Sequence, residues 1–178
     1  MDALLLIDLQ EDFLSTPRLA QVRPGLLRAA RSWIALAQKH DVPIVEIRTV
    51  LPHDRDTWAL NMRDDDSPVA LEGTDGAGRV RELDDLEAQL VLKTRDDAFL
   101  GTDLERRLCD VRAERLVIAG VSTQACVALT AAGAYARDLR VSLAAGAVAS
   151  EDDAAHVRTL QWLADEYRQH LVRPDAVF

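Results

Sequence analysis

The sequence predicts an α/β fold: a three-layer α/β/α, Rossmann-like domain with a mostly parallel six-stranded sheet at its centre. Short aliphatic runs alternate along the chain with longer amphipathic runs, which is typical of strands joined by crossover helices. The run 3–7 is apolar at every position, as expected of a strand that helices cover on both faces. A chain of 178 residues has the usual size of one domain, so we expect a single domain over 1–178.

The individual elements follow from composition and periodicity. Each predicted strand is a short run rich in aliphatic or β-branched residues. In chain order the strands are expected at 3–7, 42–48, 88–93, 115–119, 139–143 and 170–172. Each predicted helix has apolar residues that recur every three to four positions. In chain order the helices are expected at 24–40, 102–110, 123–137 and 152–167.

Local signals indicate where three of these helices begin. Pro24 fits the first turn of a helix, because a proline there loses no helical hydrogen bond. Thr102 and Glu105 have the spacing of a capping box, so the second helix is expected to start there. Ser150 is expected to cap the last helix. The inward face of that helix is expected to comprise Val157, Leu160, Ala164 and Tyr167.

The segment 49–86 interrupts the alternation of strands and helices. Nothing in it has the pattern of a long element, and three glycines, Gly73, Gly76 and Gly78, fall close together. Unstructured segments of this length are uncommon in compact domains and are usually functional or disordered. Two interpretations stay open: a lid or subunit contact, and a plain surface excursion.

Composition restricts the class of partner. With 21 Lys and Arg against 30 Asp and Glu, the net charge of −9 disfavours binding to nucleic acid or to an anionic membrane surface. The apolar run 3–7 is far shorter than the ~20 residues that cross a bilayer. Two cysteines, Cys109 and Cys126, do not make a disulfide framework and indicate a reducing, cytoplasmic location. The expected partner is therefore a small-molecule substrate.

Three reactive side chains follow predicted strands. Asp8 comes directly after 3–7, Lys93 ends 88–93, and Cys126 lies shortly after 115–119. Because the carboxyl ends of parallel strands meet at one edge of a sheet, we expect these side chains to converge. A carboxylate, an ammonium group and a thiol together suit nucleophilic catalysis. Cys109, inside a predicted helix with no such neighbours, is interpreted as a buried packing residue.

Each of the three side chains has a definite expected role. Cys126 falls in the first turn of the predicted helix 123–137, where unsatisfied N–H groups favour a thiolate, and Lys93 would lower the pKa of the thiol further. Asp8 would accept the thiol proton and later deliver it to a departing nitrogen. Backbone N–H groups in the turn 120–126 would hold the oxyanion that forms when a carbonyl is attacked.

Three segments resemble the motifs of the isochorismatase-like cysteine hydrolases, in the order that the family has them. Segment 7–13 (IDLQEDF) resembles the opening motif. Lys93 with 97–104 (DAFLGTDL) is similar to the lysine motif, and 120–127 (GVSTQACV) is similar to the cysteine motif. The resemblance spans residues 3–150. It implies the isochorismatase-like hydrolase fold and cleavage of a C–N bond in a small amide, ureido or lactam substrate through a thioester.

The resemblance also implies roles for residues of this chain. Asp8, Lys93 and Cys126 would form the catalytic triad. The peptide bond between Val121 and Ser122 would be cis, and the amides of Ser122 and Cys126 would form the oxyanion hole. Because family members are usually multimeric, a homo-oligomer is expected.

A metal and other cofactors are not expected. Nicotinamidases of this family hold a divalent metal with an Asp-x-His pair and a further histidine. Here His53 has no aspartate two residues before it and no second histidine nearby. His53 is instead a candidate substrate contact, together with Phe13 and Trp58, which suit the wall of a small pocket. A surface histidine and an oligomer contact of Trp58 are the alternatives.

Two non-enzymatic classes are the alternatives to a hydrolase. A nucleotide or flavin binder would carry a glycine-rich loop after the first strand, whereas 9–13 contains no glycine and two carboxylates. A family member that has lost activity and serves as a ligand-binding or assembly subunit stays open, although all three triad residues are present.

Overall fold

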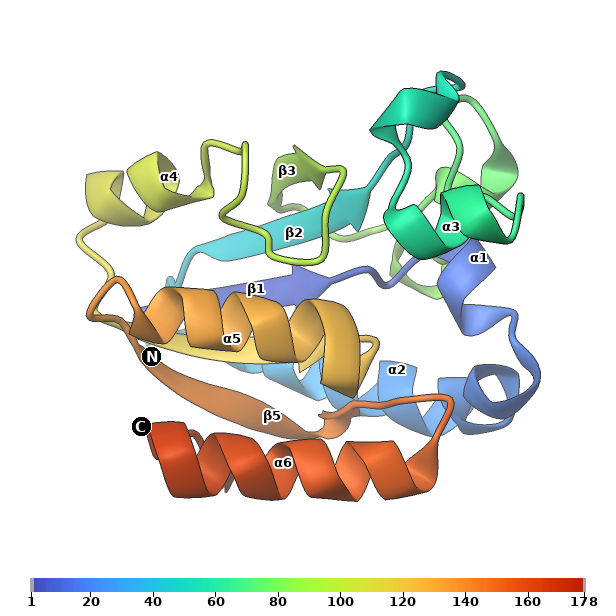
Figure 1. The fold of residues 1–178 in the computed structure, drawn as a ribbon. Coiled ribbons are helices and arrows are strands. Elements are labelled where there is room, and N and C mark those ends of the chain that lie inside the picture. The colour runs from blue at the N-terminus through green and yellow to red at the C-terminus, as the bar shows by residue number, and fades with distance from the viewer. Residues whose placement is uncertain (1, 178) are drawn as a thin grey trace.

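The computed structural model describes residues 2–177 and contains the predicted sheet (Figure 1). Six strands lie in the order β3-β2-β1-β4-β5-β6, and every neighbouring pair is parallel. Their bounds are β1 Ala3–Ile7, β2 Ile44–Thr49, β3 Gln89–Lys93, β4 Arg115–Gly120, β5 Arg140–Val148 and β6 Leu171–Val172. The predicted fold class is confirmed, and β5 continues five residues beyond its predicted end.

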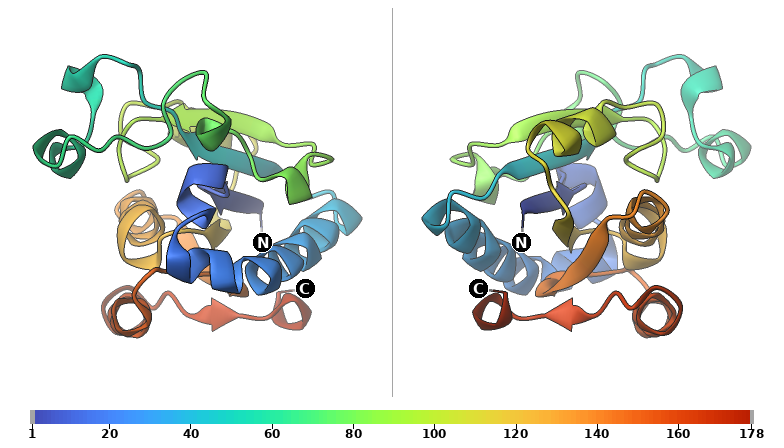
Figure 2. Two further views of the ribbon diagram at one scale, coloured as in Figure 1. Left: turned by 90° about the vertical axis from the view of Figure 1, so that its right-hand side faces the viewer. Right: turned by 90° about the vertical axis from the view of Figure 1, so that its left-hand side faces the viewer.

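The helices cover both faces of the sheet. Their bounds are α1 Glu11–Leu14, α2 Pro17–Lys39, α3 Leu60–Asp64, α4 Leu104–Asp110, α5 Ala128–Tyr135 and α6 Asp153–Tyr167. Helix α2 lies on one side of the sheet, and α5 and α6 lie on the other (Figure 2). None of the helices within residues 2–177 is long and apolar enough to cross a membrane.

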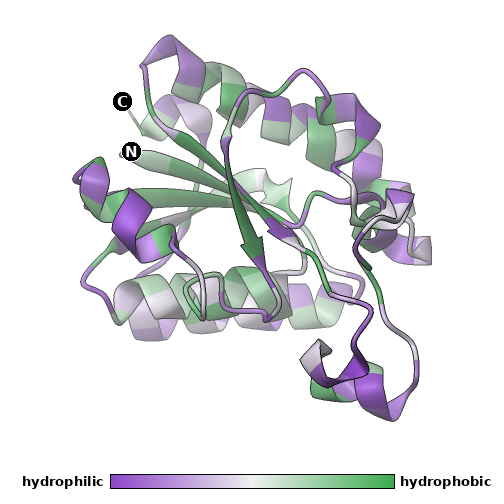
Figure 3. Cartoon of the chain, turned by 90° about the horizontal axis from the view of Figure 1, so that it is seen from above, coloured by the Kyte–Doolittle hydropathy of each residue, from purple (hydrophilic) through white to green (hydrophobic). Residues whose placement is uncertain are grey.

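Strand β1 shows why the chain folds into these layers. All five of its side chains are buried, and they alternate between two hydrophobic cores. Leu5 packs in the core that includes Ala131 of α5 and Leu163 of α6, whereas Leu4 packs in the core that includes Trp33 of α2. The strands are accordingly hydrophobic along their length, and polar residues lie on the outer faces of the helices (Figure 3). A strand without alternation is thus buried on both faces, as predicted.

Helix α2 begins earlier than predicted. Pro17, and not Pro24, occupies its first turn, and Pro24 lies inside the helix with its ring exposed. Leu19 is buried seven residues before Leu26, so the inward stripe of the helix starts before the predicted first residue, Pro24. Packing of this stripe on the sheet outweighs the cost of one proline on the solvent side.

Helix α6 has the predicted extent but a different cap and a shifted inward face. Asp152 accepts hydrogen bonds from the amides of Ala154 and Ala155, whereas Ser150 accepts one from the amide of Asp152. Val157 is 64% exposed, and Leu163 is fully buried. The inward stripe therefore runs through Leu160, Leu163 and Tyr167.

The segment between β2 and β3 contains only short elements, namely α3 and 3-10 turns at Arg55–Thr57, Asp75–Ala77 and Arg81–Leu83. It is fastened to the body by an antiparallel bridge between Gln10 and Arg79, and Leu51 and Leu71 pair within it. Helix α3 lies beyond the carboxyl end of β2, at the right of Figure 1. A role as lid or subunit contact stays a prediction.

The strand order determines where a ligand site forms. The chain winds outward from β1 to β2 and β3, and then in the other direction through β4, β5 and β6. In such a Rossmann-type order, ligands bind beyond the carboxyl ends of the strands at the point of reversal. That point lies between β1 and β4, where Ile7 pairs with Gly120. Gly120 has a φ of +134°, and a Cβ there would lie 2.0 Å from the carbonyl oxygen of Ile7, so only glycine fits.

Candidate active site

Asp8, Lys93 and Cys126 converge at the carboxyl edge of the sheet, as the sequence predicted. Lys93 Nζ lies 2.8 Å from Asp8 Oδ2 and 3.3 Å from Cys126 Sγ. All three residues are buried, and the side chains of Asp8 and Lys93 are 1% and 0% exposed. The ammonium group therefore lies between an acid and a nucleophile, away from bulk water.

Two further residues complete this cluster, and the sequence analysis missed both. The hydroxyl of Thr49, at the end of β2, donates to Asp8 Oδ1 at 2.9 Å and accepts from Lys93 Nζ at 2.6 Å. Gln10 accepts from the amide of Thr49 at 2.8 Å and donates to its carbonyl at 2.8 Å. Both side chains are buried. The signal for Thr49 was its place at a strand end, the same signal that identified Asp8 and Lys93.

The charges of the cluster stabilise one another. Burial disfavours the ammonium form of Lys93, but the negative charge of Asp8 and the hydrogen bonds to Asp8 and Cys126 outweigh it and raise the pKa of Lys93. Asp8 also accepts the amide and the hydroxyl of Thr49 on Oδ1. These contacts fix Asp8, which has a φ of 52°, in a conformation that aspartate adopts more readily than most residues.

The protonation state expected for Cys126 is wrong. Burial, and then the charge of Asp8, raise the pKa of the Cys126 thiol well above its ordinary value, and the nearby Lys93 does not compensate. Because Asp8 neutralises the charge of Lys93, the thiol lies next to a nearly neutral ion pair in a site without bulk water. The resting nucleophile is therefore a thiol whose proton leaves as the bond to substrate forms.

The turn that carries Cys126 is not the start of a regular helix. Thr123–Val127 forms a π-helical turn before α5, and Ala125 has non-helical angles of φ −116° and ψ −105°. The peptide bond between Val121 and Ser122 is cis, as the resemblance implied. The oxyanion hole at the amides of Ser122 and Cys126 stays a prediction, and Ala125 and Val127 both donate to the Ser122 carbonyl beside it.

Contacts with the other half of the sheet anchor this turn. Thr123 is fully buried, and its amide and hydroxyl lie 2.9 and 3.0 Å from the carbonyl oxygen of Ala149. Its hydroxyl also lies 2.7 Å from Nδ1 of His156, on the first turn of α6. Burial lowers the pKa of His156, so its ring is neutral at pH 7. Ala149 and His156 thus fix the start of the nucleophile turn.

Asp96 links the nucleophile to a cavity. The thiol of Cys126 donates to Asp96 Oδ1 at 3.4 Å. Asp96 and Trp58 both line a cavity of 340 Å³, and Cys126 is not among its lining residues. A volume of that size suits a small ligand. The sequence analysis missed Asp96, which follows Lys93 by three residues in the loop after β3.

The three candidate substrate contacts lie in different places. Trp58 is on the wall of that cavity, and its indole N–H donates to the carbonyl of Pro52 at 2.9 Å. His53 is exposed, and its Nε2 lies 3.0 Å from the carbonyl oxygen of Glu72. Phe13 is partly buried against the core under α2. The structure thus places Trp58 on the cavity that Asp96 lines, and substrate contacts by all three residues stay predictions.

The residues around His53 can be compared with the metal ligands that nicotinamidases of the family have. Two residues before His53, where a ligating aspartate would stand, the chain has Leu51, which is 1% exposed. The carbonyl of Glu72 already engages His53. Within residues 2–177 no three His, Cys, Asp or Glu side chains cluster as metal ligands would. A buried leucine cannot replace a carboxylate, so these residues do not fit the metal.

The second cysteine is exposed, contrary to its interpretation as a packing residue. Cys109 lies on the solvent side of α4, and the neighbouring Leu108 occupies the core. Both thiols are free. A cysteine next to a buried leucine on a helix points to another side of that helix, about 100° away.

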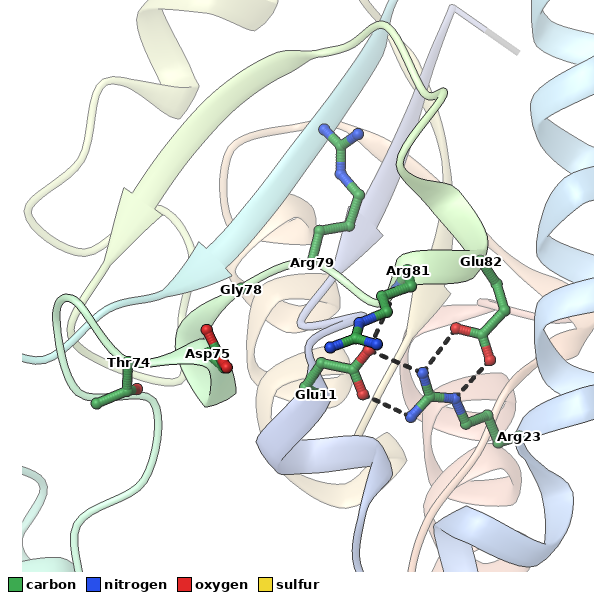
Figure 4. Close-up of a pocket in the computed structure, with 8 residues that line it drawn as sticks. All are labelled: Glu11, Arg23, Thr74, Asp75, Gly78, Arg79, Arg81 and Glu82. Carbon is green, nitrogen blue, oxygen red and sulfur yellow. Dashed lines mark hydrogen bonds and ion pairs between the residues drawn. The ribbon is translucent and has the colours of Figure 1, made fainter.

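A second cavity, of 710 Å³, lies away from the nucleophile. It is formed by the start of α1, α2 and the segment 74–82, and Arg23 lies between Glu11 and Glu82 within it (Figure 4). Arg23 Nη1 is 2.7 Å from Glu11, and Nη2 is 2.6 Å from Glu82. The cluster holds α1, α2 and the turn Arg81–Leu83 together, and none of Asp8, Lys93 and Cys126 lines this cavity.

Known proteins are similar to this chain in sequence and in fold. An *Arabidopsis thaliana* protein described as a probable inactive nicotinamidase is 31% identical over 153 residues, covering 76% of this chain and 74% of that protein. A *Bacillus subtilis* protein described as an uncharacterized isochorismatase family protein, PncA, is 41% identical over 73 residues. That match spans 41% of this chain and only 40% of the *Bacillus* protein.

Solved structures superpose over nearly the whole chain. An isochorismatase family protein from *Desulfovibrio vulgaris* has a TM-score of 0.87 at 21% identity, covering 98% of this chain and 95% of that one. N-carbamoylsarcosine amidase from *Thermoplasma acidophilum* has a TM-score of 0.84 at 24% identity, covering 98% and 97%. The family model described as the isochorismatase domain matches residues 2–170. Because that match takes in every strand of the sheet but the last and all six helices, this chain belongs to the isochorismatase family of hydrolases.

Proposed function

We propose that this chain is a cysteine hydrolase that cleaves a C–N bond of a small amide, ureido or lactam substrate through a thioester on Cys126. One observation carries the proposal: a buried lysine lies 2.8 Å from a carboxylate and 3.3 Å from a thiol at the point of reversal of the sheet. A set of acid, cation and thiol with no bulk water around it is suited to covalent catalysis. The amidase among the similar structures acts on a C–N bond, as its name states.

The first half of the reaction forms the thioester. As Cys126 Sγ bonds to the carbonyl carbon, its proton passes to Asp8, and the carbonyl oxygen takes the negative charge. Lys93, held by Asp8 and Thr49, stabilises the sulfur while it is anionic. The C–N bond then breaks, the nitrogen takes the proton from Asp8, and ammonia or an amine leaves. For a lactam the amine stays attached to the acyl group.

The second half releases the acid. Asp8, again a carboxylate, takes a proton from water, and the hydroxide oxygen bonds to the thioester carbon. The C–S bond breaks, and the thiolate regains the proton from Asp8. The sum is amide plus water giving acid plus amine, with the protein unchanged. The raised pKa of the Cys126 thiol fits this course, because proton transfer to Asp8 is needed in each cycle.

The test is a screen of small amides, ureides and lactams for release of ammonia or amine. Cys126→Ala is expected to lower turnover by about 10³-fold or more while the unfolding curve stays that of a folded protein. Cys109→Ala, at the exposed free thiol, is the matched control and is expected to keep full activity. Mass spectrometry of rapidly quenched enzyme should detect an acyl group on the peptide that contains Cys126. Full turnover by Cys126→Ala would refute the proposal.

An inactive family member that binds a ligand or serves in an assembly is the second candidate. The *Arabidopsis* relative, described as probably inactive, favours it. This candidate predicts no turnover across the screen by a correctly folded protein and no acyl adduct on Cys126.

A further inference from the structure

The cavity beside the nucleophile has an apolar wall that is open to solvent. Leu60 of α3, Leu100 of the loop after β3 and Leu129 of α5 line it and are 70%, 60% and 47% exposed. With Trp58 they come from three separate parts of the chain. Asp96 lines the same cavity and accepts from the Cys126 thiol at 3.4 Å, so one side chain connects the cavity to the nucleophile.

Two arginines, Arg63 and Arg95, line the same cavity without an acidic partner. Within residues 2–177 no carboxylate forms an ion pair with either guanidinium. Nε of Arg63 is buried and has no hydrogen-bond partner among these residues. Arg95 Nη1 donates to the carbonyls of Thr57 and Thr94, which leaves the rest of its guanidinium unused. Both cations are thus available to a ligand.

This lack of partners separates the two residues from other arginines of similar burial. Every other half-buried arginine in the described part of the chain forms an ion pair with a carboxylate, namely Arg18, Arg23, Arg48, Arg79, Arg107 and Arg137. A buried N–H of a charged group that is left unsatisfied is costly, because the group has lost its water and gained no partner. Arg63 has such an N–H and Arg95 lies in the same cavity without an ion pair among residues 2–177, so an external anion would satisfy both cations.

The aspartates of the cavity do not supply that anion. Asp96 accepts from the thiol of Cys126. Asp97 accepts from the amide of Phe99 at 2.9 Å, and its carboxylate lies against the backbone of α5 at Gly133. Asp96 and Asp97 thus each accept a hydrogen bond from another residue, and neither pairs with Arg63 or Arg95.

We propose that this cavity binds a carboxylate-bearing amide, with its acidic group on Arg63 and Arg95 and its apolar part against the leucines. The inference rests on the proposed function, which supplies the hydrolysis of the bound amide. Arg63 is then a specificity-determining residue: it selects acidic over neutral amides through binding. A planar guanidinium matches a carboxylate with two parallel hydrogen bonds, which lysine does not reproduce.

The first experiment measures anion binding without turnover. The Cys109→Ala protein, which keeps only the thiol of Cys126, is alkylated with neutral iodoacetamide at alkaline pH in the presence of glutarate or of uncharged 1,5-pentanediol. Glutarate is expected to slow alkylation, and the diol is not. Arg63→Met should weaken protection by about 10-fold or more, and Arg63→Lys less. Arg158→Met, at an exposed arginine of α6 that forms no ion pair with any of residues 2–177, should leave protection unchanged.

The second experiment compares glutaramate, the monoamide of glutarate, with butyramide. The wild-type protein should favour glutaramate in kcat/KM by about 10-fold or more, and Arg63→Met should remove this preference through KM. Equal use of both amides, or protection by glutarate that Arg63→Met leaves intact, would overturn the inference and leave the hydrolase standing. Protection by glutarate with no hydrolysis of any amide would support the anion site and refute the proposed hydrolysis.

Discussion

Strand β1 has an aspartate next to each of its ends, and each aspartate pairs with a cation from elsewhere in the sheet. Asp2, before the strand, lies 3.0 Å from Arg115, and Asp8, after it, lies 2.8 Å from Lys93. The side chains of the first pair are 28% and 60% exposed, whereas those of the second pair are 1% and 0% exposed. The bond lengths are nearly equal, so burial is what differs.

The difference shows how one kind of ion pair serves two purposes. Water screens the Asp2–Arg115 pair, which ties the start of β1 to β4 and contributes little energy. The Asp8–Lys93 pair has lost its water, so each charge depends on the other and on Thr49. A buried pair of this kind controls the protonation of a neighbouring group, and Cys126 is that group.

Removing one charge from each pair should give the largest difference in the free energy of unfolding between two variants. Lys93→Met leaves Asp8 buried without a counter-charge and is expected to lower the free energy of unfolding by about 3–5 kcal/mol. Arg115→Met, at the exposed and solvent-screened pair, should lower the free energy of unfolding far less. Urea unfolding monitored by circular dichroism measures both.

A double variant sharpens this test. Asp8→Asn combined with Lys93→Met leaves no unpaired charge and should recover part of the stability lost in Lys93→Met. Equal losses in Lys93→Met and Arg115→Met would mean that burial does not separate the two pairs.

The second prediction concerns the thiol beside the buried pair. Because the pKa of Cys126 is raised by burial and by Asp8, its alkylation by iodoacetamide should rise only at alkaline pH. Asp8→Asn removes a charge that raises this pKa and should move the alkylation profile to lower pH, whereas Lys93→Met should move it further up. Peptide mass spectrometry follows both cysteines, with exposed Cys109 as the internal reference. Labelling of Cys126 at neutral pH as fast as Cys109 would contradict the assignment.

The third prediction concerns the hydroxyl that joins the buried pair. Thr49→Val keeps the shape of the side chain but removes the contacts to Asp8 Oδ1 and Lys93 Nζ. The expected loss of stability is about 1–3 kcal/mol, with lower turnover and a shifted alkylation profile of Cys126. Thr49→Ser keeps the hydroxyl and should retain the wild-type profile. An unchanged profile in Thr49→Val would show that Thr49 has only a packing role.

The smallest effect is expected at the exposed pair and depends on pH. The pKa of Asp2 is lowered. Burial acts to raise it, but the hydrogen bonds from the Arg115 side chain and from the amides of Glu114 and Arg115 outweigh burial. A carboxyl whose pKa is lowered on folding stabilises the protein above its unfolded pKa, near 4, and this stability is lost as the pH falls through the folded value. Asp2→Asn should therefore cost about 1 kcal/mol or less at pH 7, with a difference that vanishes in strong acid. Unfolding curves at several pH values measure it.

Local patterns were sufficient for most of the fold. Uniformly apolar runs identified β1 and β4, and strand ends identified Asp8, Lys93 and Cys126. The start of α2 was misjudged because a proline signal is local, whereas the packing of Leu19 on the sheet is not. The interpretation of Cys109 failed for the same reason: a helix has several sides, and only packing decides which of them is buried.

The sequence by itself determined that the sheet is parallel and covered on both faces, because burial on both faces requires uninterrupted apolar strands, and parallel strands bring their carboxyl ends together. Only the tertiary structure decided the electrostatics of the site. Thr49 and Asp96 reach the cluster through space, and the pKa of Cys126 rises because water is excluded and Asp8 offsets Lys93. Energies of charges depend on distance and on the surrounding medium, and neither quantity is written in the order of residues along the chain.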